Sequence, residues 1–427
     1  MTEETAKIPA KIPAKRSAKR TAGKGAVVLL RDAGEDVYLM EPMRISAENG
    51  ALPVLTDLAL DLTKRSTSFR ASLPRGLAEP LAEFVRSMNC YYSNLIEGRN
   101  THPVDIERAL NNDLSTNANK RDLQLEAKAH IEVQRWIDDG GLTGNEMTID
   151  GVREIHRRFT NLLPEELRWI ENLETGQKRP VLAGEWRDHD VKVGNHVPVS
   201  PGAIPRFMRR FEERYSSIGQ FESILAAGPA HHRLVHIHPF ADGNGRVARL
   251  MSYATLRRTL DTAGLWSVAR GLSRRKDEYM AHLSACDQIR RWDRDGRGHL
   301  GEAALSSFTS FFLEICIDQV DFMEKLMQPA AFRDRITKWA EEQIRFGTIP
   351  PKGSRVLEAI LFKGSLQKGE VAEVLNQSER TANNVTQALV KHGIIASKGA
   401  RLPWQIAFPA KLAARLMPGL FPNLPTD

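Results

Sequence analysis

The chain has 427 residues, of which 41% are hydrophobic and 26% charged. This length exceeds one ordinary hydrophobic core, so we expect a globular protein of two or three domains. Because the sequence contains no apolar run of eighteen residues, and no apolar segment follows the N-terminal lysines, we expect neither a membrane span nor a secretory signal.

The net charge of +7 is concentrated at the two ends. Residues 1–25 hold seven Lys or Arg against two acids, and residues 351–427 hold ten against five. Each end is therefore +5 and the middle is −3. We expect any attraction to a polyanion at the ends. The first segment repeats Ala-Lys-Ile-Pro and cannot build a core, so we expect a disordered basic tail over residues 1–25.

Cysteine usage indicates the compartment. Cys90, Cys286 and Cys316 are far apart and odd in number, which argues against a disulfide framework. We therefore expect a cytoplasmic protein with three buried thiols.

The N-terminal region begins with short strands and becomes helical. Two apolar runs, 26–30 and 37–40, predict strands. Farther on, apolar residues at three-and-four spacing predict a helix over residues 77–97 that stops at Gly98. Thr101 is expected to cap the helix that follows.

Glu97 occupies an unfavourable position in the last turn of that helix. Its carboxylate faces the negative end of the helix dipole, at a cost of roughly 0.3–1 kcal/mol. We expect a cation beside it, unless the side chain points into water.

The segment before the strongest motif differs from the helical regions around it. Residues 104–160 predict helices with a break near 138–141. Residues 183–187 and 191–195 then predict two short strands joined by a turn at 188–190. A plain surface hairpin is the alternative to a functional one.

The strongest motif is His-Pro-Phe-Ala-Asp-Gly-Asn-Gly-Arg-Val-Ala-Arg, residues 238–249. Pro239 ends the apolar, helix-compatible run 224–237, and a helical pattern resumes over 247–260. The Gly-Asn-Gly sequence between them lets the backbone approach a ligand. The unpaired N–H groups at the start of the second helix then offer a site for phosphates.

The side chains of the motif suit phosphate chemistry. His238 is a candidate general base, and Asp242 offers the hard oxygen ligand that Mg²⁺ prefers. Arg246 and Arg249, three apart, share one helix face. A Gly-x-Gly turn or an arginine pair alone is common, but together these residues favour nucleotidyl or phosphoryl transfer.

A histidine cluster offers an alternative metal site. His231, His232 and His236 lie close to His238 in the sequence. His232 and His236 are spaced i, i+4 on the expected helix. No His-Glu-x-x-His pattern or cysteine pair accompanies them. We therefore expect His232 and His236 to pack and form hydrogen bonds behind the motif.

The C-terminal 80 residues resemble a winged helix-turn-helix. Helices are predicted over 355–362 and 368–375, and a third, capped by Ser378, runs to His392. Runs 394–397 and 404–408 would form the wing. The third helix would expose side chains able to reach bases or phosphates: Arg380, Thr381, Asn383, Asn384, Gln387 and Lys391. Such modules also serve as interaction or dimerisation domains, so DNA and a homodimer both remain open.

The motif at 238–249 resembles the signature of the Fic family, His-x-Phe-x-Asp/Glu-Gly-Asn-Gly-Arg-x-x-Arg, at every fixed position. The resemblance covers roughly residues 80–325. It implies a mostly α fold, namely a helical core with a small β-hairpin flap, to which the winged helix is added. The expected domains are the tail 1–25, an N-terminal helical region 26–140, the Fic core 141–330 and the winged-helix-like domain 331–427.

The same resemblance implies an activity, transfer of AMP from ATP, with Mg²⁺ or Mn²⁺, to a Ser, Thr or Tyr hydroxyl of a protein, self-modification included. His238 would take the hydroxyl proton and Asp242 would hold the metal. Asn244 would orient either the loop or the α-phosphate. The rest of the motif would bind the phosphates: Gly243, Gly245, Arg246 and Arg249.

Two further segments match the family. Ser93 to Gly98 resembles its inhibitory motif Ser/Thr-x-x-x-Glu-Gly/Asn, which implies that Glu97 pairs with Arg249 and diverts it from the γ-phosphate. Residues 183–195 resemble the flap that pairs main chain to main chain with the target, which assigns docking to Gly184, Trp186, Arg187, Val191 and Val193.

Other functions remain as alternatives. Glu97 could orient a water for removal of AMP, or the enzyme could transfer another nucleotide. The family often carries paired tyrosines and an asparagine near the base, whereas this chain has only Tyr279 there. Two further alternatives are a DNA-binding regulator that senses a nucleotide and a toxin that a partner protein inhibits.

Overall fold

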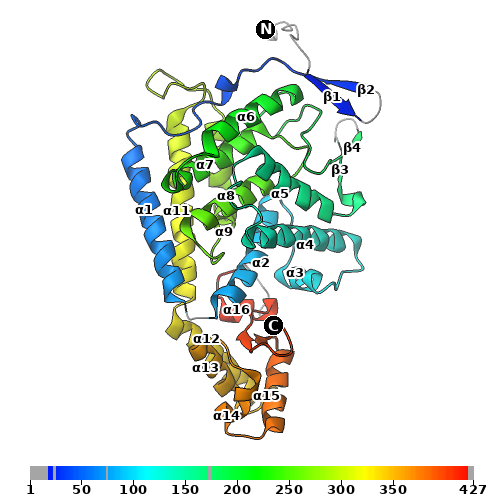
Figure 1. The fold of residues 1–427 in the computed structure, drawn as a ribbon, viewed down its shortest axis with the longest axis vertical. Coiled ribbons are helices and arrows are strands. Elements are labelled where there is room, and N and C mark those ends of the chain that lie inside the picture. The colour runs from blue at the N-terminus through cyan, green and yellow to red at the C-terminus, as the bar shows by residue number, and fades with distance from the viewer. Residues whose placement is uncertain (1–17, 23–25, 74–75, 172–175, 422–427) are drawn as a thin grey trace, which may run out of the picture.

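The computed structural model describes residues 18–22, 26–73, 76–171 and 176–421. Within them the fold is mostly helical, as expected, and the strands form three separate two-stranded antiparallel sheets (Figure 1). The strands are β1 (Ala18–Ala22), β2 (Ala26–Leu30), β3 (Trp169–Glu171), β4 (Lys178–Pro180), β5 (Ile395–Ala396) and β6 (Gln405–Ile406).

The main body is built from eleven consecutive α-helices of the described chain. They are α1 (Leu52–Ser72), α2 (Ala78–Ile96), α3 (Pro103–Leu110), α4 (Ala118–Asp138), α5 (Ile149–Leu162), α6 (Ile204–Tyr215), α7 (Gln220–Ile237), α8 (Asn244–Leu260), α9 (Val268–Arg274), α10 (Lys276–Cys286) and α11 (Glu302–Leu326). Helices α7 and α8 pack against each other in the centre, while α1 and α11 run side by side along one edge (Figure 1).

Helix α11 is a core helix. Among the described residues it alone is long and apolar enough to cross a membrane by length and composition. Most of its apolar stretch is buried, against α1, α7, α9 and α10. Phe308 and Phe312 on this helix are fully buried. The apolar composition is thus explained by packing inside the protein.

Two hydrophobic clusters position the motif. One surrounds the helices that carry it and includes Phe240, Val247 and Met251. The other runs from α1, α2 and α11 into the C-terminal helices. Helix α2 therefore packs in the cluster that joins the main body to the C-terminal region.

The C-terminal helices lie at the lower end of the molecule in Figure 1. They are α12 (Pro329–Arg345), α13 (Gly353–Lys363), α14 (Val371–Leu375), α15 (Glu379–Lys391) and α16 (Ala413–Leu416). Ser378 caps α15 by accepting from the Thr381 amide, as the sequence predicted. Antiparallel β5 and β6 lie within the two predicted wing segments. The order of elements is that of the predicted module.

This C-terminal region rests directly on α2. The Tyr92 hydroxyl donates to the Leu420 carbonyl at 2.6 Å, and the rings of Phe84 and Phe408 stack with centroids 5.7 Å apart. Lys398 on the wing forms an ion pair with Glu79 at the start of α2. The helix that ends at Glu97 is therefore in contact with both parts of the molecule.

Several predicted elements differ from the structure. Residues Val37–Met40 form a 3-10 helix, not a strand, because the Asp36 carboxylate caps it by accepting from the Tyr38 amide at 2.8 Å. Ala18–Ala22, within the expected disordered tail, pair with β2; residues 1–17 and 23–25 lie outside the described residues.

One helix boundary also differs. His102, not Thr101, is the N-cap of α3, and Thr101 is buried. Farther along the chain, α9 and α10 are separated at Arg275, which leaves helical geometry.

Candidate active site

The motif lies in the loop between α7 and α8. His238 ends α7 with φ 50°, and Gly243 precedes α8 with φ 80°, so both adopt the left-handed conformation that reverses the chain. The Asn244 side chain closes the loop: its amide donates to the Phe240 carbonyl and its oxygen accepts from the Phe240 amide, both at 2.9 Å. The sequence left Asn244 to orient either the loop or a phosphate, and in the structure it orients the loop.

The orientation of His238 suits a general base. Its Nδ1 lies 3.3 Å from the Val235 carbonyl, which can only accept, so Nδ1 carries the proton and Nε2 has a free lone pair. Burial lowers the pKa of His238 to about 4. The imidazole is therefore neutral at pH 7 and able to take a proton.

A second histidine packs against the motif loop. His156 on α5 stacks on Phe240 with ring centroids 3.9 Å apart and planes at 5°. Its Nδ1 accepts from the Gly184 amide at 2.9 Å. Burial lowers its pKa to about 4, so this ring is also neutral. Sequence reasoning missed His156; its place in the buried phase of α5, between Val152 and Phe159, is the available signal.

Arg249 is held by the end of α2. Its Nε donates to the Ser93 hydroxyl at 2.9 Å, and its Nη2 lies 2.5 Å from Glu97 Oε1. Ser93 is fully buried and Arg249 is 3% exposed. The cation expected beside Glu97 is thus present, and it is the arginine named from the sequence.

The Glu97 carboxylate also occupies the amino end of α8. A Cβ placed on Gly245 would lie 2.6 Å from Glu97 Oε1, so the glycine is needed for this approach. Burial opposes ionisation of Glu97, but the charge and hydrogen bond of Arg249, with the charges of Arg246 and Arg99, lower its pKa overall. An anionic carboxylate therefore sits where the helix dipole favours a phosphate.

Arg246 is buried with unused donors. It is 4% exposed, and its Nε and Nη1 atoms have no hydrogen-bond partner among the described residues. Its Nη1 lies 3.6 Å from Glu126 Oε2, and its guanidinium carbon lies 4.6 Å from the Phe159 ring centroid. Buried donors without partners are costly, so an anionic ligand beside Arg246 would stabilise this arrangement.

Glu126 was not recognised from the sequence. It lies on α4, is 4% exposed, and also pairs with Arg99. Burial raises its pKa, an effect that the charges of Arg246 and Arg99 only partly offset. Its spacing from the buried Ala129 and Val133 marks it as a charged residue on a buried helix face.

Asp242 has the chemistry of a magnesium ligand. Its carboxylate is half exposed, and one oxygen lies 3.4 Å from Arg246 Nη2. Mg²⁺ is commonly held by one or two carboxylates together with substrate phosphates and waters. A single accessible carboxylate beside an anion cradle fits that mode of binding.

The segment before the motif does not form the predicted hairpin. Residues 183–187 and 191–195 contain no regular strand, and the chain reverses instead at Gly194 and Asn195, inside the Val193–His196 bridge. The regular hairpin nearby is β3–β4. The expected turn at 188–190 is wrong because tertiary contacts, and not a strand ladder, satisfy this backbone.

Arg187 supplies most of those contacts. It is 2% exposed, and it donates to the carbonyls of His238 and His189, both at 2.8 Å, and to that of Val199. Its own amide donates to the Pro239 carbonyl at 2.9 Å. Arg187 therefore ties this segment to the motif loop.

The other predicted flap residues divide into two groups. Gly184 and Trp186 lie at the anchored end, where Trp186 packs on Phe240 with centroids 5.1 Å apart. Val191 and Val193 lie toward the tip, and Val193 is 40% exposed. The tip therefore offers apolar surface that another chain could contact.

The neighbouring histidines pack and form hydrogen bonds, as expected. His231 bonds Ser252 Oγ at 3.0 Å and the Tyr279 hydroxyl at 2.7 Å. Tyr279 is 1% exposed, so it supports the core and presents no open face for a base. His232 and His236 both contact Asp287.

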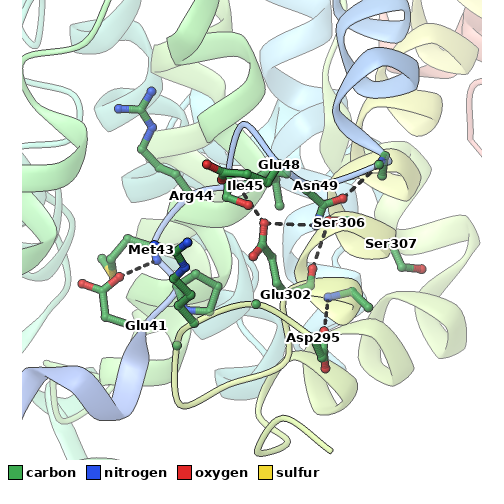
Figure 2. Close-up of a pocket in the computed structure, with 18 of the residues that line it drawn as sticks. Glu41, Met43, Arg44, Ile45, Glu48, Asn49, Asp295, Glu302, Ser306 and Ser307 are labelled. Atoms are coloured by element: carbon green, nitrogen blue, oxygen red, sulfur yellow. Dashed lines mark hydrogen bonds between the residues drawn. The ribbon is translucent and has the colours of Figure 1, made fainter. Parts of the chain in front are cut away.

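A wide groove lies away from the motif. It measures about 1240 Å³ and is lined by residues 41–51, by the loop 293–298 and by α11 (Figure 2). Figure 2 shows Glu302 at its floor, where the carboxylate accepts from the Ser46 amide at 2.7 Å and from the Asn49 side chain at 3.0 Å. Glu302 therefore fastens the N-terminal segment to α11, and the motif remains the better candidate site.

Comparisons with known proteins agree with this location. Residues 146–256 match the family model described as Fic/DOC family. Two curated relatives named protein adenylyltransferase Fic are similar to the chain, one from Drosophila erecta (31% identical over 170 residues) and one from Drosophila willistoni (32% over 172). Each match covers 39% of this chain and 31% of the relative, so the chain spans about a third of their length.

Two solved structures are also similar. A Fic family protein from Desulfovibrio desulfuricans is 15% identical with a TM-score of 0.49, over 85% of this chain and 98% of that one. A Fic domain containing signaling protein from Bacteroides thetaiotaomicron is 19% identical with a TM-score of 0.44, over 64% and 96%.

Proposed function

Since residues 146–256 carry a domain of the Fic/DOC family, we propose that this chain is a protein adenylyltransferase that moves AMP from ATP to a Ser, Thr or Tyr hydroxyl. The observation that carries the proposal is the neutral His238, whose free Nε2 stands beside a helix N-terminus flanked by two buried arginines. Transfer of AMP requires both a general base for the hydroxyl and a site that binds the phosphates.

The reaction asks for positioning and charge stabilisation. The target hydroxyl gives its proton to His238 Nε2 while its oxygen forms a bond to the α-phosphorus of ATP. The bond from that phosphorus to the bridging oxygen breaks, and pyrophosphate leaves. Arg246 and Arg249 neutralise the charge on the leaving group, and the first amides of α8 cradle the phosphates.

Asp242 would hold the divalent cation, Mg²⁺ or Mn²⁺. The ion, when bound, neutralises charge on the phosphates of ATP. Asp242 has one further role in this chain: its carboxylate lies near Arg246 and helps to fix that guanidinium at the loop.

Glu97 acts as an internal brake in this proposal. While it pairs with Arg249 and occupies the amino end of α8, the γ-phosphate cannot use either group. ATP would then bind with its α-phosphate out of line with the incoming hydroxyl. Removing the carboxylate restores both anion-binding groups.

The target protein would dock at the tip of the segment 183–199. Val193 and Val197 are 40% and 69% exposed, and only one bridge, between Val193 and His196, uses the backbone of the tip. An extended segment can add to such an edge through main-chain hydrogen bonds. An extended segment of this protein itself could dock in the same way, so the proposal includes self-modification.

Labelled ATP tests the proposal in the Glu97→Gly variant with Mg²⁺. Label from the α-phosphate is expected on protein, whereas label from the γ-phosphate is expected in pyrophosphate. Protein labelled from the γ-position would identify a kinase-like reaction and overturn the proposal. Loss of AMP from a premodified target, faster with Glu97 than without it, would instead assign removal of AMP as the main activity.

The C-terminal helix α15 favours a second candidate function, DNA binding by a nucleotide-sensing regulator. Five of the six polar side chains predicted for its outer face are exposed, and Thr381 is partly buried. The exposed ones are Arg380, Asn383, Asn384, Gln387 and Lys391. Duplex binding that weakens steeply with salt, and further weakens in Arg380→Ala, would support this candidate. Absence of binding at low salt would remove it.

The thiols support the expected cytoplasmic location. Cys90, Cys286 and Cys316 are all free and buried, and burial raises the pKa of each. We propose that the reaction takes place in the reducing cytoplasm.

A further inference from the structure

Three metal-ligating side chains converge beside the active site from distant parts of the sequence. His196 lies at the tip of the segment 183–199, His236 lies near the end of α7, and Asp287 follows α10. One ligand atom of each lies within 4.8 Å of the others. His236 is two residues from the catalytic His238.

The two groups nearest the surface face each other with free lone pairs. His196 Nε2 donates to the His236 carbonyl at 2.7 Å, which leaves Nδ1 without a proton. That Nδ1 lies 3.8 Å from Asp287 Oδ2. Ligand atoms at this separation can share one ion, because metal–nitrogen and metal–oxygen bonds are each about 2.0–2.2 Å. The hydrogen bond from Nε2 to a carbonyl is the usual support of a ligating imidazole.

The other carboxylate oxygen is fixed by the remaining histidines. Asp287 Oδ1 lies 2.7 Å from His236 Nδ1 and 3.1 Å from His232 Nε2. His232 is locked in this tautomer because its Nδ1 accepts from Arg233 at 2.6 Å. An ion bound between His236 Nδ1 and Asp287 would replace this hydrogen bond, and the proton of the neutral His236 ring would move to Nε2.

The charge of the cluster favours a cation. Burial opposes ionisation of Asp287, yet the hydrogen bonds from His232 and His236 keep its pKa well below the usual value. Burial lowers the pKa of His232 to about 3 and also lowers the pKa of His236. At neutral pH the Asp287 carboxylate therefore faces the neutral imidazoles of His232 and His236. The buried Arg233 guanidinium behind His232 is a positive group near this cluster.

We propose that His196, His236 and Asp287 bind one divalent transition-metal ion, for which Zn²⁺ is the best match. Two imidazoles and one carboxylate, with a water in the fourth position, form a common zinc ligand set. Mg²⁺ prefers oxygen ligands, so this site is chemically distinct from Asp242. It does not depend on the proposed transferase activity.

The ion would fasten the docking segment to the catalytic helix. Only His196 comes from the tip, whereas the other two ligands come from α7 and the end of α10. Binding would therefore restrain residues 191–197 beside His238. We expect their backbone amides to exchange more slowly with deuterium when Zn²⁺ is added.

Cobalt titration of the full chain, without a histidine tag and after EDTA treatment, tests the site. One Co²⁺ per chain should give the intense visible absorption of a low-symmetry nitrogen–oxygen site, and Zn²⁺ should displace it. His196→Ala and Asp287→Asn should each lower Co²⁺ affinity at least about tenfold. His189→Ala is the matched control, because His189 lies on the same segment but bonds Asp188.

Two results would overturn the proposal. The first is Co²⁺ binding that is absent, or equal in the unchanged protein, His196→Ala and Asp287→Asn. The second is exchange at residues 191–197 that Zn²⁺ does not slow in the unchanged protein. Thermal unfolding of each variant shows whether its fold is intact, and His196→Ala removes a half-buried surface side chain, so its comparison remains valid if Asp287→Asn fails to fold.

Discussion

The motif loop and the segment 183–199 build one site but are held in place by opposite means. The loop is fixed by its own backbone, through left-handed His238 and Gly243 and the reciprocal bonds between Asn244 and Phe240. The segment is held by contacts with neighbouring elements: its Arg187 donates to the His238 carbonyl of the loop, and its Gly184 amide donates to His156 on α5. Local chemistry therefore sets the catalytic group, whereas long-range contacts set the surface that would receive the target.

This difference separates two functional tasks. Changes in the loop should alter both ATP binding and transfer, because the base and the phosphate cradle share one turn of chain. Changes in the segment should alter acceptance of the target hydroxyl more than ATP binding.

Replacing the base should break the chemistry without disturbing the cradle. In a Glu97→Gly background, His238→Ala should lower AMP transfer by about 10²–10⁴-fold, the usual share of a general base. ATP affinity, measured by calorimetry, should change by less than about threefold, since Nε2 faces the acceptor and not the phosphates. Transfer that persists would require another base.

Opening the loop should affect both functions. Asn244→Ala leaves the buried amide and carbonyl of Phe240 without partners, so the free energy of unfolding should fall by about 1–3 kcal/mol. Because the loop then shifts, we expect transfer to fall by roughly 10²-fold, together with weaker ATP binding. Unchanged ATP affinity in a folded Asn244→Ala protein would show that the base and the phosphate cradle do not depend on the same loop.

Loosening the segment should affect transfer alone. Arg187→Lys removes the guanidinium group that donates to three carbonyls. The loss of one charge-assisted hydrogen bond costs about 1.5 kcal/mol, which corresponds to roughly tenfold slower transfer. ATP affinity should be retained. Arg335→Lys on α12 is the control, since Arg335 also donates to main-chain carbonyls, those of Leu416 and Leu326, away from the segment. Equal effects of both substitutions would remove the special role of Arg187.

The pH dependence should be the smallest effect near neutrality. Because burial lowers the pKa of His238 to about 4, the neutral base predominates at every pH well above 4 and is lost only as pH falls through that value. Transfer by Glu97→Gly should therefore vary less than twofold between pH 7 and 5.5. An acid limb centred near 6.5, the ordinary histidine pKa, would show that His238 is solvated.

The same contrast explains what could be predicted from the sequence. The loop was predicted because its helix stop, its glycines and its charged side chains are local signals, and the end of α2 followed from its apolar spacing. Residues 183–187 and 191–195 were predicted wrongly as two short strands. The carbonyls of His189, Val199 and His238 instead accept from the Arg187 side chain, and no local sequence pattern records that choice.

Residues behind the motif could not be assigned for a related reason. Glu126 and His156 lie on α4 and α5, where a charged or aromatic residue on an apolar face has many explanations. Their roles depend on the positions of Arg246 and Phe240, which only the packing of the helices determines.

The most direct test of the central claim, that Glu97 restrains His238-dependent transfer, uses α-labelled ATP with Mg²⁺. Three proteins are compared: the unchanged chain, Glu97→Gly, and Glu97→Gly with His238→Ala. The account predicts protein-bound label mainly in the second. Equal label in the first two would contradict the brake, and equal label in the last two would contradict the base.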